Sequence, residues 1–227
     1  MESIRQLSYP HIEWIVVDGG STDGTVDLLR QVRTDYCGFI WISEKDSGIY
    51  DAWNKAIRMS HGEWVAFLGA GDTINSDTYD IYFRAIVKQA RVPDLVSSKM
   101  RLVDQSGRVV RVKGEAFQWA NFRKKMTVAH PGALHHRSLF DRYGLFDITF
   151  ASAGDYEFLM RCGQDIKAIY LDFISVNMLV GGTSDGYRGL AETFHIQCKY
   201  GVNPLAAKYR HCLASAKRYM RPFFRGY

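Results

Sequence analysis

The stretch Glu-Trp-Val-Ala-Phe-Leu-Gly-Ala-Gly-Asp at residues 63–72 is the part of this sequence that says most about its fold. Trp64–Leu68 is a short apolar run of the length typical of a strand buried on both faces. The run ends at Gly69-Ala70-Gly71, where small residues let a backbone or a ligand come close, and a carboxylate, Asp72, follows at once. Ligands of open α/β sheets bind beyond the carboxyl ends of the strands, so Asp72 is placed either to meet a ligand or to cap the turn.

The composition is that of an ordinary globular protein of 227 residues, 47% hydrophobic and 23% charged. This length indicates one domain, or one domain with an extension. The formal charge of +5 favours acidic ligands such as nucleotides, or an anionic membrane surface, without requiring either. The four cysteines form no Cys-x-x-Cys pair, which argues against a zinc site or a disulfide framework and fits a reducing cytosol. No apolar run approaches the ~20 residues that a membrane span needs.

An acidic, glycine-rich loop also follows each of two earlier predicted strands. The β-branched run Ile12–Val17 leads into Asp-Gly-Gly-Ser-Thr-Asp-Gly-Thr at 18–25, and a helical pattern follows. Phe39–Ser43 leads into Glu-Lys-Asp-Ser-Gly at 44–48 and then into a predicted helix, Ile49–Met59. The apolar face predicted for that helix contains Ile49, Trp53, Ala56 and Ile57. Helix N-termini favour anions, although each loop alone also fits an ordinary βα turn. Three such loops on one rim of a parallel sheet predict a binding site.

Three motifs occur in a fixed order along the first third of the chain. They are Ile-Val-Val-Asp-Gly-Gly-Ser-Thr-Asp-Gly-Thr (15–25), Glu-Lys-Asp-Ser-Gly-Ile-Tyr-Asp-Ala-Trp-Asn-Lys-Ala (44–56) and Gly-Glu-Trp-Val-Ala-Phe-Leu-Gly-Ala-Gly-Asp (62–72). Together they resemble family 2 glycosyltransferases of the GT-A fold, and the likeness extends over about residues 3–182. It implies an α/β fold with a Rossmann-like, mostly parallel sheet flanked by helices. It also implies a cytoplasmic, nucleotide-sugar-dependent transferase that inverts the anomeric centre.

The resemblance assigns roles to residues that would hold the sugar donor. The acid matching Asp18 and the loop acid matching Asp46 contact the base and ribose of the nucleotide. The acid matching Asp72 belongs to the family's DxD signature, which holds a divalent cation, Mg²⁺ or Mn²⁺, on the diphosphate. Asp72 is the single carboxylate of that motif here, and such an ion needs few protein ligands. The predicted donor-binding residues are Asp18, Gly20, Ser21, Asp46, Gly48, Asn54 and Gly71, and the expected donor is a UDP-sugar.

A second group of residues is predicted to face the acceptor. Ala-Gly-Asp-Tyr-Glu at 153–157 resembles the start of the family's "ED" helix. Asp155 then matches the catalytic base, which takes the proton from the acceptor hydroxyl as that hydroxyl attacks the anomeric carbon. Without the other motifs, Asp155 fits a helix N-cap better. Glu157, Arg161 and His130 are predicted to line the acceptor side, and a structural role for His130 is equally open.

The chain departs from the family pattern at its start. The family's usual first strand, with its Thr-Pro-x-Tyr-Asn type of motif, is missing, and Met1 corresponds to a position inside the first helix. In the family that strand lies in the middle of the sheet beside the strand at 12–17, so its absence would leave backbone donors and acceptors unpaired. We expect either an N-terminally shortened form or another segment in this place. A catalytically inactive, truncated remnant that binds a partner is therefore the alternative to an active transferase.

The C-terminal segment is helical in pattern and basic. We expect a GT-A domain at 1–188 and a basic helical extension at 189–227, after a glycine-rich loop at 181–186 that either closes over the donor or is a flexible connection. Beyond Glu192 the extension has no acid, and aromatic residues alternate with its basic ones. Such a tail is either a solvated surface helix or a peripheral contact with an anionic membrane.

The membrane contact would suit a lipid-linked acceptor, and a saccharide acceptor is the other expectation. Family breadth favours a role in surface polysaccharide biosynthesis by analogy. Nucleic acid is not an expected partner, because the sequence has no recognition motif for it.

Overall fold

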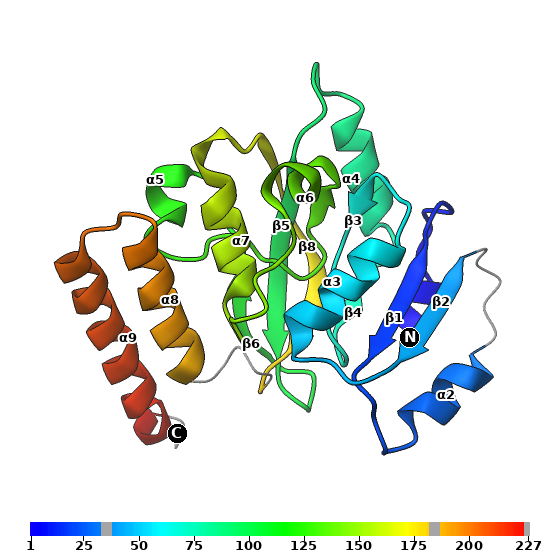
Figure 1. Cartoon of the computed structure of the whole chain (residues 1–227), viewed down its shortest axis with the longest axis horizontal. Helices are drawn as coiled ribbons and strands as arrows, with labels where there is room; N and C mark the ends of the chain where they lie inside the picture. The colour runs from blue at the N-terminus through cyan, green and yellow to red at the C-terminus, as the bar shows by residue number, and fades with distance from the viewer. Residues whose placement is uncertain (33–37, 182–186, 225–227) are drawn as a thin grey trace.

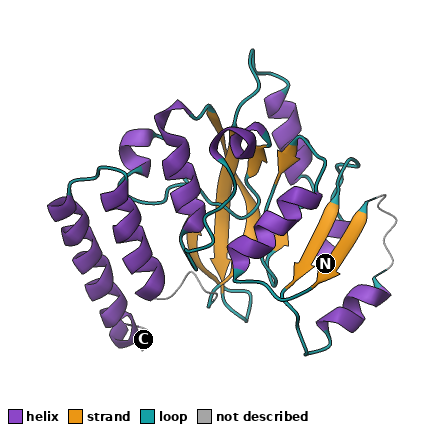
Figure 2. Cartoon of the chain, in the orientation of Figure 1, coloured by secondary structure: helices purple, strands orange, loops and turns teal. Residues whose placement is uncertain are grey.

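The strands in the described part of the chain form two sheets, drawn in orange in Figure 2. The computed structural model describes residues 1–32, 38–181 and 187–224. Strand β1 (Trp14–Asp18) pairs in parallel with β2 (Phe39–Ser43) as a two-stranded sheet. The other sheet is six-stranded. Its order is β3 (Trp64–Val65), β7 (Leu134–His136), β5 (Leu95–Val103), β8 (Ala168–Leu179) and β4 (Thr73–Ile74), with β6 (Val109–Lys113) paired to β5.

The helices pack on these sheets and extend beyond them on one side. They are α1 (Glu2–Arg5), α2 (Thr25–Gln31), α3 (Ile49–Met59), α4 (Thr78–Ile86), α5 (Trp119–Phe122), α6 (Ser138–Tyr143), α7 (Gly154–Cys162), α8 (Tyr187–Lys199) and α9 (Pro204–Phe224). Figure 1 shows α3 beside β1, α7 to the left of β5, and the pair α8–α9 at the left edge. Strands β1, β2 and β5 run toward the lower end of this view. The first turn of α7 lies at the same end. The predicted site therefore belongs to that end.

Several predicted elements have the predicted bounds. Strand Phe39–Ser43 and helix Ile49–Met59 are confirmed residue for residue. The strand predicted at Trp64–Leu68 is shorter, since it ends at Val65. Its neighbour β7 has three residues, so beyond Val65 the pairing is reduced to one hydrogen bond, from the amide of Gly132 to the carbonyl oxygen of Phe67 at 3.1 Å.

The α/β class is confirmed, but the six-stranded sheet is mixed rather than mostly parallel. Pairs β1–β2 and β5–β8 are parallel, whereas β3–β7, β4–β8, β5–β6 and β5–β7 are antiparallel. Parallel neighbours need a crossover of about a dozen residues or more, usually a helix. The connection from β5 to β6 is instead a tight turn, closed by a hydrogen bond between the amide of Asp104 and the carbonyl of Arg108.

The main hydrophobic core joins α7 to the C-terminal helices. Phe158 and Leu159 of α7 and Ile196 of α8 are completely buried in one cluster, which also contains Val202 and Ala207. The predicted boundary at residue 188 falls inside α8, a helix that shares this core. Among the described helices, none combines the length and the apolar character needed to cross a bilayer. The predicted loop 181–186 lies outside the described residues from position 182 onward.

Strand β1 has a single strand neighbour, β2, within the described part of the chain. Residues Trp14–Val17 are correspondingly half-buried instead of buried. Among the described residues, no strand pairs with the other edge of β1, where the sequence analysis expects either a gap or another segment. The loops after β1 and β2 are thus supported from α3 rather than from a continuous sheet.

Candidate functional site

The carboxylate of Asp18 organises the loop that follows β1. Its Oδ2 accepts hydrogen bonds from the amides of Gly20 (3.1 Å) and Ser21 (2.9 Å) and from the hydroxyl of Ser43 (2.6 Å) at the end of β2. Gly20 has a φ of +88°, a conformation that only glycine adopts easily and that turns both amides back toward the acid. The hydrogen bonds from Ser21 and Ser43 hold the pKa of Asp18 down at about 2. Asp18 is therefore an ionised, 7% exposed carboxylate that ties the two loops together.

The predicted acid Asp46 lies directly against the Asp18 loop. A Cβ atom on Gly19 would come within 2.7 Å of Oδ2 of Asp46, so the two loops touch because residue 19 is a glycine. The other oxygen, Oδ1, accepts a hydrogen bond from the amide of Gly48 at 2.9 Å. Gly48 precedes the first turn of α3, so Asp46 is held beside a helix N-terminus. The structure thus brings the loops that carry Asp18 and Asp46 into one group.

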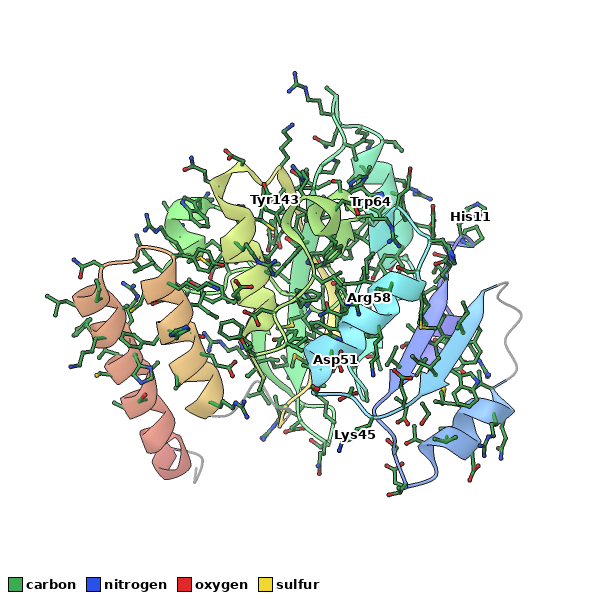
Figure 3. The ribbon with its side chains drawn as sticks, viewed as in Figure 1. His11, Lys45, Asp51, Arg58, Trp64 and Tyr143 are labelled. Atoms are coloured by element: carbon green, nitrogen blue, oxygen red, sulfur yellow. The ribbon has the colours of Figure 1, made fainter. Side chains whose placement is uncertain are left out.

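A lysine of α3 fixes the position of the loop at 44–48. Lys55 Nζ donates a hydrogen bond to the carbonyl oxygen of Lys45 at 3.0 Å and forms an ion pair with Glu44 at 2.8 Å. Figure 3 shows Lys45 in this loop and Asp51 at the first turn of α3, both near the carboxyl ends of β1 and β2. The loop that carries Asp46 is therefore anchored to α3 at its first two residues.

Tyr50 and Asp155 form the second group of the site. The Tyr50 hydroxyl donates a hydrogen bond to Oδ1 of Asp155 at 3.2 Å, and the same oxygen accepts the amide of Tyr156 at 2.9 Å. Burial raises the pKa of Asp155, an effect that these bonds only partly offset. Burial, together with the charge of Asp155, also raises the pKa of Tyr50, so its hydroxyl stays protonated and acts as the donor at neutral pH. The arrangement is a carboxylate of raised basicity at the first turn of a helix.

A glycine makes the contact between these two residues possible. A Cβ atom on Gly154 would lie 2.8–2.9 Å from three carbon atoms of the Tyr50 ring. Such distances are well inside van der Waals contact, so any larger residue at 154 would push the ring away. The glycine in the Ala-Gly-Asp-Tyr-Glu motif is therefore explained by a side chain on α3.

Sequence reasoning did not single out Tyr50 or Ser43. The helical periodicity placed Ile49 on the apolar face of α3, and this prediction is wrong, because Ile49 is 37% exposed. Tyr50 is 3% exposed instead, since its ring turns toward α7. The available signal was position: Ser43 and Tyr50 stand immediately before and within the second motif.

Asn54, predicted to bind the donor, is held inside the protein. It is 3% exposed, and both ends of its amide are bonded to one backbone unit. Nδ2 donates to the carbonyl of Phe146 at 2.9 Å, and Oδ1 accepts the amide of Phe146 at 3.0 Å. These bonds fasten α3 to the segment that leads into α7. The contact is a structural one, which fixes how the Tyr50 and Asp155 helices meet.

Asp72 lies beside Leu179, the last residue of β8. Its hydrogen-bond partners differ from those of the other predicted acids. Its Oδ1 accepts the amide of Leu179 and its Oδ2 the amide of Gly69, both at 3.2 Å. Burial raises the pKa of Asp72, and these two bonds lower it in part. Gly71, the last predicted donor residue, stands beside it, with a φ of +89°.

The donor set around Asp72 fits one kind of metal ion. Within the described residues, no three His, Cys, Asp or Glu side chains gather as a metal site. A lone carboxylate fits Mg²⁺ or Mn²⁺, because such an ion keeps several waters and takes further oxygen ligands from a diphosphate. It does not fit an ion such as structural zinc, which needs four protein ligands.

The predicted acceptor-side residues Glu157 and Arg161 are engaged with each other. Glu157 is 1% exposed and accepts from Arg161 (3.1 Å), Lys199 (3.2 Å) and the hydroxyl of Tyr200 (2.5 Å). Arg161 also donates to the carbonyl oxygen of Leu145 at 2.8 Å. A buried carboxylate with this many partners is typical of a structural ion pair. The pair joins α7 to the end of α8.

His130 is part of the core. It is 3% exposed and stacks on Trp53 and Phe67, with ring centroids 5.0 Å and 5.4 Å away. Burial lowers its pKa to about 3, so the ring is neutral at physiological pH. Its Nε2 has no hydrogen-bond partner among the described residues. This packing favours the structural role that the sequence left open.

Comparisons with known proteins show the family and the fold of this chain. Residues 1–143 match the family model described as glycosyl transferase family 2. A PGL/p-HBAD biosynthesis glycosyltransferase of Mycobacterium bovis (strain BCG / Pasteur 1173P2) is 27% identical over 163 residues, which are 71% of this chain. The match covers 62% of that relative, so the chain spans about three fifths of the relative's length.

Two solved structures share the fold. S. aureus TarS 1–349 in complex with UDP-GlcNAc superposes with a TM-score of 0.69 at 18% identity, over 97% of this chain and 67% of that one. The mannosyltransferase PcManGT from Pyrobaculum calidifontis, in complex with GDP-Man and Mn²⁺, gives 0.61 at 20% identity, over 96% of this chain and 64% of that one. The family match over more than half of the chain, with these neighbours, shows that the protein belongs to glycosyl transferase family 2 and has the GT-A fold.

Proposed function

We propose that this protein transfers a sugar from a nucleotide-diphosphate donor to a hydroxyl group, with inversion at the anomeric carbon. The observation that carries the proposal is the Tyr50–Asp155 pair, a partly buried carboxylate of raised pKa at the first turn of α7. In the proposed step Asp155 takes the proton of the acceptor hydroxyl while the oxygen of that hydroxyl bonds to the anomeric carbon. The nucleoside diphosphate leaves with the electron pair of the broken bond. A base in this position typically contributes about 10²–10⁴-fold to the rate.

The donor is proposed to lie on the loops after β1 and β2. Asp18, with Gly20 and Ser21, and Asp46, with Gly48, would contact the base and ribose. The mutual contacts of these loops support the assignment, because they form one prearranged surface. The TarS and PcManGT complexes contain UDP-GlcNAc and GDP-Man, which supports a nucleotide-sugar donor in general. We propose a UDP-sugar.

Asp72, with Gly71 beside it, is the proposed holder of a divalent cation. When bound, the cation would neutralise charge on the leaving diphosphate. Support comes from the lone carboxylate at the end of β8 and from the Mn²⁺ in the PcManGT complex.

The first test is calorimetric titration of UDP into the protein with and without Mn²⁺. We expect binding that needs the metal and that is lost in Asp72→Ala. Asp77→Ala is the matched control, because Asp77 is exposed and its side chain makes no capping bond to α4. Asp155→Asn should abolish transfer while leaving UDP affinity nearly unchanged. Full turnover in Asp155→Asn would contradict the assignment of the base.

A specific observation motivates the alternative of an inactive, partner-binding remnant. Strand β1 has one strand neighbour among the described residues, so the donor loops are supported less completely than in a continuous sheet. The same titration separates the two proposals. Failure to bind UDP, GDP and dTDP in the presence of Mn²⁺ would favour the remnant.

For the acceptor we propose a saccharide or lipid-linked hydroxyl in surface polysaccharide synthesis, at the cytoplasmic face of a membrane. Helix α9 supports the membrane contact. Leu205, Tyr209 and Leu213 follow one another at helical spacing and are 80%, 66% and 42% exposed. Exposed apolar side chains on a basic helix favour an anionic bilayer surface.

Vesicle sedimentation tests this contact. Co-sedimentation with phosphatidylserine-containing vesicles, weakened in Leu205→Ser/Leu213→Ser and by high salt, is the expected outcome. Equal sedimentation of the variant and the wild type would contradict the proposed contact.

A further inference from the structure

One carboxylate of α8 accepts three backbone amides from the segment that precedes α7. The amide of Ala151 donates to Oε1 of Glu192, and the amides of Ser152 and Ala153 donate to Oε2, each at 2.9 Å. The Glu192 side chain is 13% exposed. Hydrogen bonds from backbone amides to a carboxylate are among the stronger ones in proteins, since the acceptor is charged. Glu192 therefore holds a segment that lies about forty residues earlier in the sequence.

The N-cap residue of α7 is held by an acceptor from another helix. This residue is Ala153, whose methyl side chain cannot accept a hydrogen bond, and α7 has no side-chain cap bond. The amides before and within the first turn of a helix need acceptors, which Ser, Thr, Asp or Asn at the N-cap normally supply. In the first turn of α7 the amide of Tyr156 bonds to Oδ1 of Asp155. Glu192, from α8, accepts the amide of the N-cap residue Ala153 and those of the two residues before it. Since Asp155 is the second residue of α7, the carboxylate that fixes the start of the helix also fixes where Asp155 projects.

A second attachment keeps α8 alongside α7. Lys199 and Tyr200, at the end of α8, both bond to the buried carboxylate of Glu157. Helices α7 and α8 lie next to each other in Figure 1 and run in the same direction. Helix α8 is therefore attached to α7 at two places, through Glu192 to the residues before α7 and through Lys199 to Glu157 within it.

We propose that Glu192 is a positioning residue for Asp155, acting through the amides of residues 151–153. It touches no substrate in this proposal. The Tyr50 hydroxyl orients the Asp155 carboxylate from α3, and Glu192 sets the helix that carries it from α8. The inference rests on the proposed function only in that Asp155 is the group that accepts the proton.

The test compares Glu192→Gln, Glu192→Asp and Arg188→Gln with the wild type. Gln keeps one oxygen and replaces the other by an amide nitrogen, which cannot accept, so at least one of the three backbone bonds is lost. We expect kcat to fall about 10- to 100-fold, the range that loss of a charged hydrogen bond gives, with calorimetric UDP affinity unchanged. Glu192→Asp should recover part of the loss. Arg188→Gln is the control, because Arg188 contacts Glu192 at 3.3 Å but is 71% exposed and holds no backbone amide of this segment.

Two readouts do not depend on turnover. Hydrogen exchange at amides 151–156 should become faster in Glu192→Gln while exchange in β5 stays unchanged. A ¹³C-carboxyl titration should show the pKa of Asp155 moving down toward its ordinary value, because a less firmly held helix start exposes the acid to water.

Wild-type exchange at 151–156 in Glu192→Gln, or equal losses of kcat and UDP affinity, would overturn the positioning role. Failure of the proposed function looks different. A wild type without turnover on any donor would refute the activity, while the exchange and the titration would still decide whether Glu192 positions Asp155.

Discussion

The Tyr50 hydroxyl and the Asp155 carboxylate lie 3.2 Å apart although 105 residues separate them in the sequence. The contact joins the first turn of α3, which follows the Asp46 loop, to the first turn of α7. Donor loops and candidate base are thus linked by one hydrogen bond. Substitutions at Tyr50 should therefore change the pKa of Asp155.

Tyr50→Phe should move the acid limb of the pH–rate profile to higher pH. The Tyr50 hydrogen bond favours the ionised carboxylate, so its loss raises the pKa of Asp155 further above the ordinary value. Since the proposed base works only when ionised, activity should be lost at a higher pH than in the wild type. Profiles of kcat/KM measure this shift. Tyr170→Phe, which removes a hydroxyl bonded to Gly114 instead, should leave the limb in place, and an unmoved limb in Tyr50→Phe would refute the coupling.

Gly154→Ala should destabilise the protein by about 1–3 kcal/mol, the usual cost of overpacking. The added methyl would meet the Tyr50 ring at 2.8–2.9 Å. In a Tyr50→Ala background the same change should cost much less, because the ring is gone. Urea unfolding of the four proteins of this double-mutant cycle measures the coupling. Equal costs in both backgrounds would show that the Tyr50 ring is not the obstacle.

Asp18 should make the stability of the protein fall in strong acid. Its pKa is about 2 in the folded protein, against an ordinary value of 3.8. A lowered folded-state pKa stabilises the fold above the unfolded value and loses this effect as the pH falls through the folded one. Asp18→Asn lacks this contribution, so its stability deficit should be largest above pH 4–5 and should shrink toward pH 2. A deficit independent of pH would contradict the ionised hydrogen-bonded carboxylate.

His130→Phe should flatten the pH dependence of stability between about pH 6.5 and 4. The folded protein keeps the ring neutral down to about pH 3, whereas the unfolded chain protonates it near 6.5. Stability is therefore complete above 6.5 and falls with decreasing pH, by about 1.4 kcal/mol per pH unit for one such group. Phe preserves the stacking on Trp53 and Phe67 and cannot be protonated. His61→Gln, at an exposed histidine, is the control and should keep the wild-type slope.

The sequence predicts best those features that depend on short contiguous motifs. The motifs at 15–25, 44–56 and 62–72 stand at strand ends, so the positions of Asp18, Asp46 and Asp72 follow from the pattern alone. Tyr50 and Asn54 belong to the same motifs, but their contacts are with Asp155 and Phe146, and helical periodicity carries no information about partners so distant.

Partners across the fold also explain what the sequence missed near α7. The motif around Glu157 predicts a site acid, yet Glu157 is buried and accepts hydrogen bonds from Lys199 and Tyr200, which gives it a structural role. The short β3 has a similar cause, because its length is set by the three residues of β7.

Because β1–β2 is separate from the six-stranded sheet, a bound donor would change the local stability of the protein. Two sheets without shared strand pairing are expected to open as separate cooperative units, and the half-buried β1–β2 pair should have the lower free energy of local unfolding. A nucleotide sugar that contacts Asp18 on one unit and Asp72 on the other would act as the missing cross-link. By mass action it would raise the opening free energy of β1–β2 by about 2.7 kcal/mol at a hundredfold excess over Kd, if it binds only the closed form. The donor would then be part of the fold of its own site.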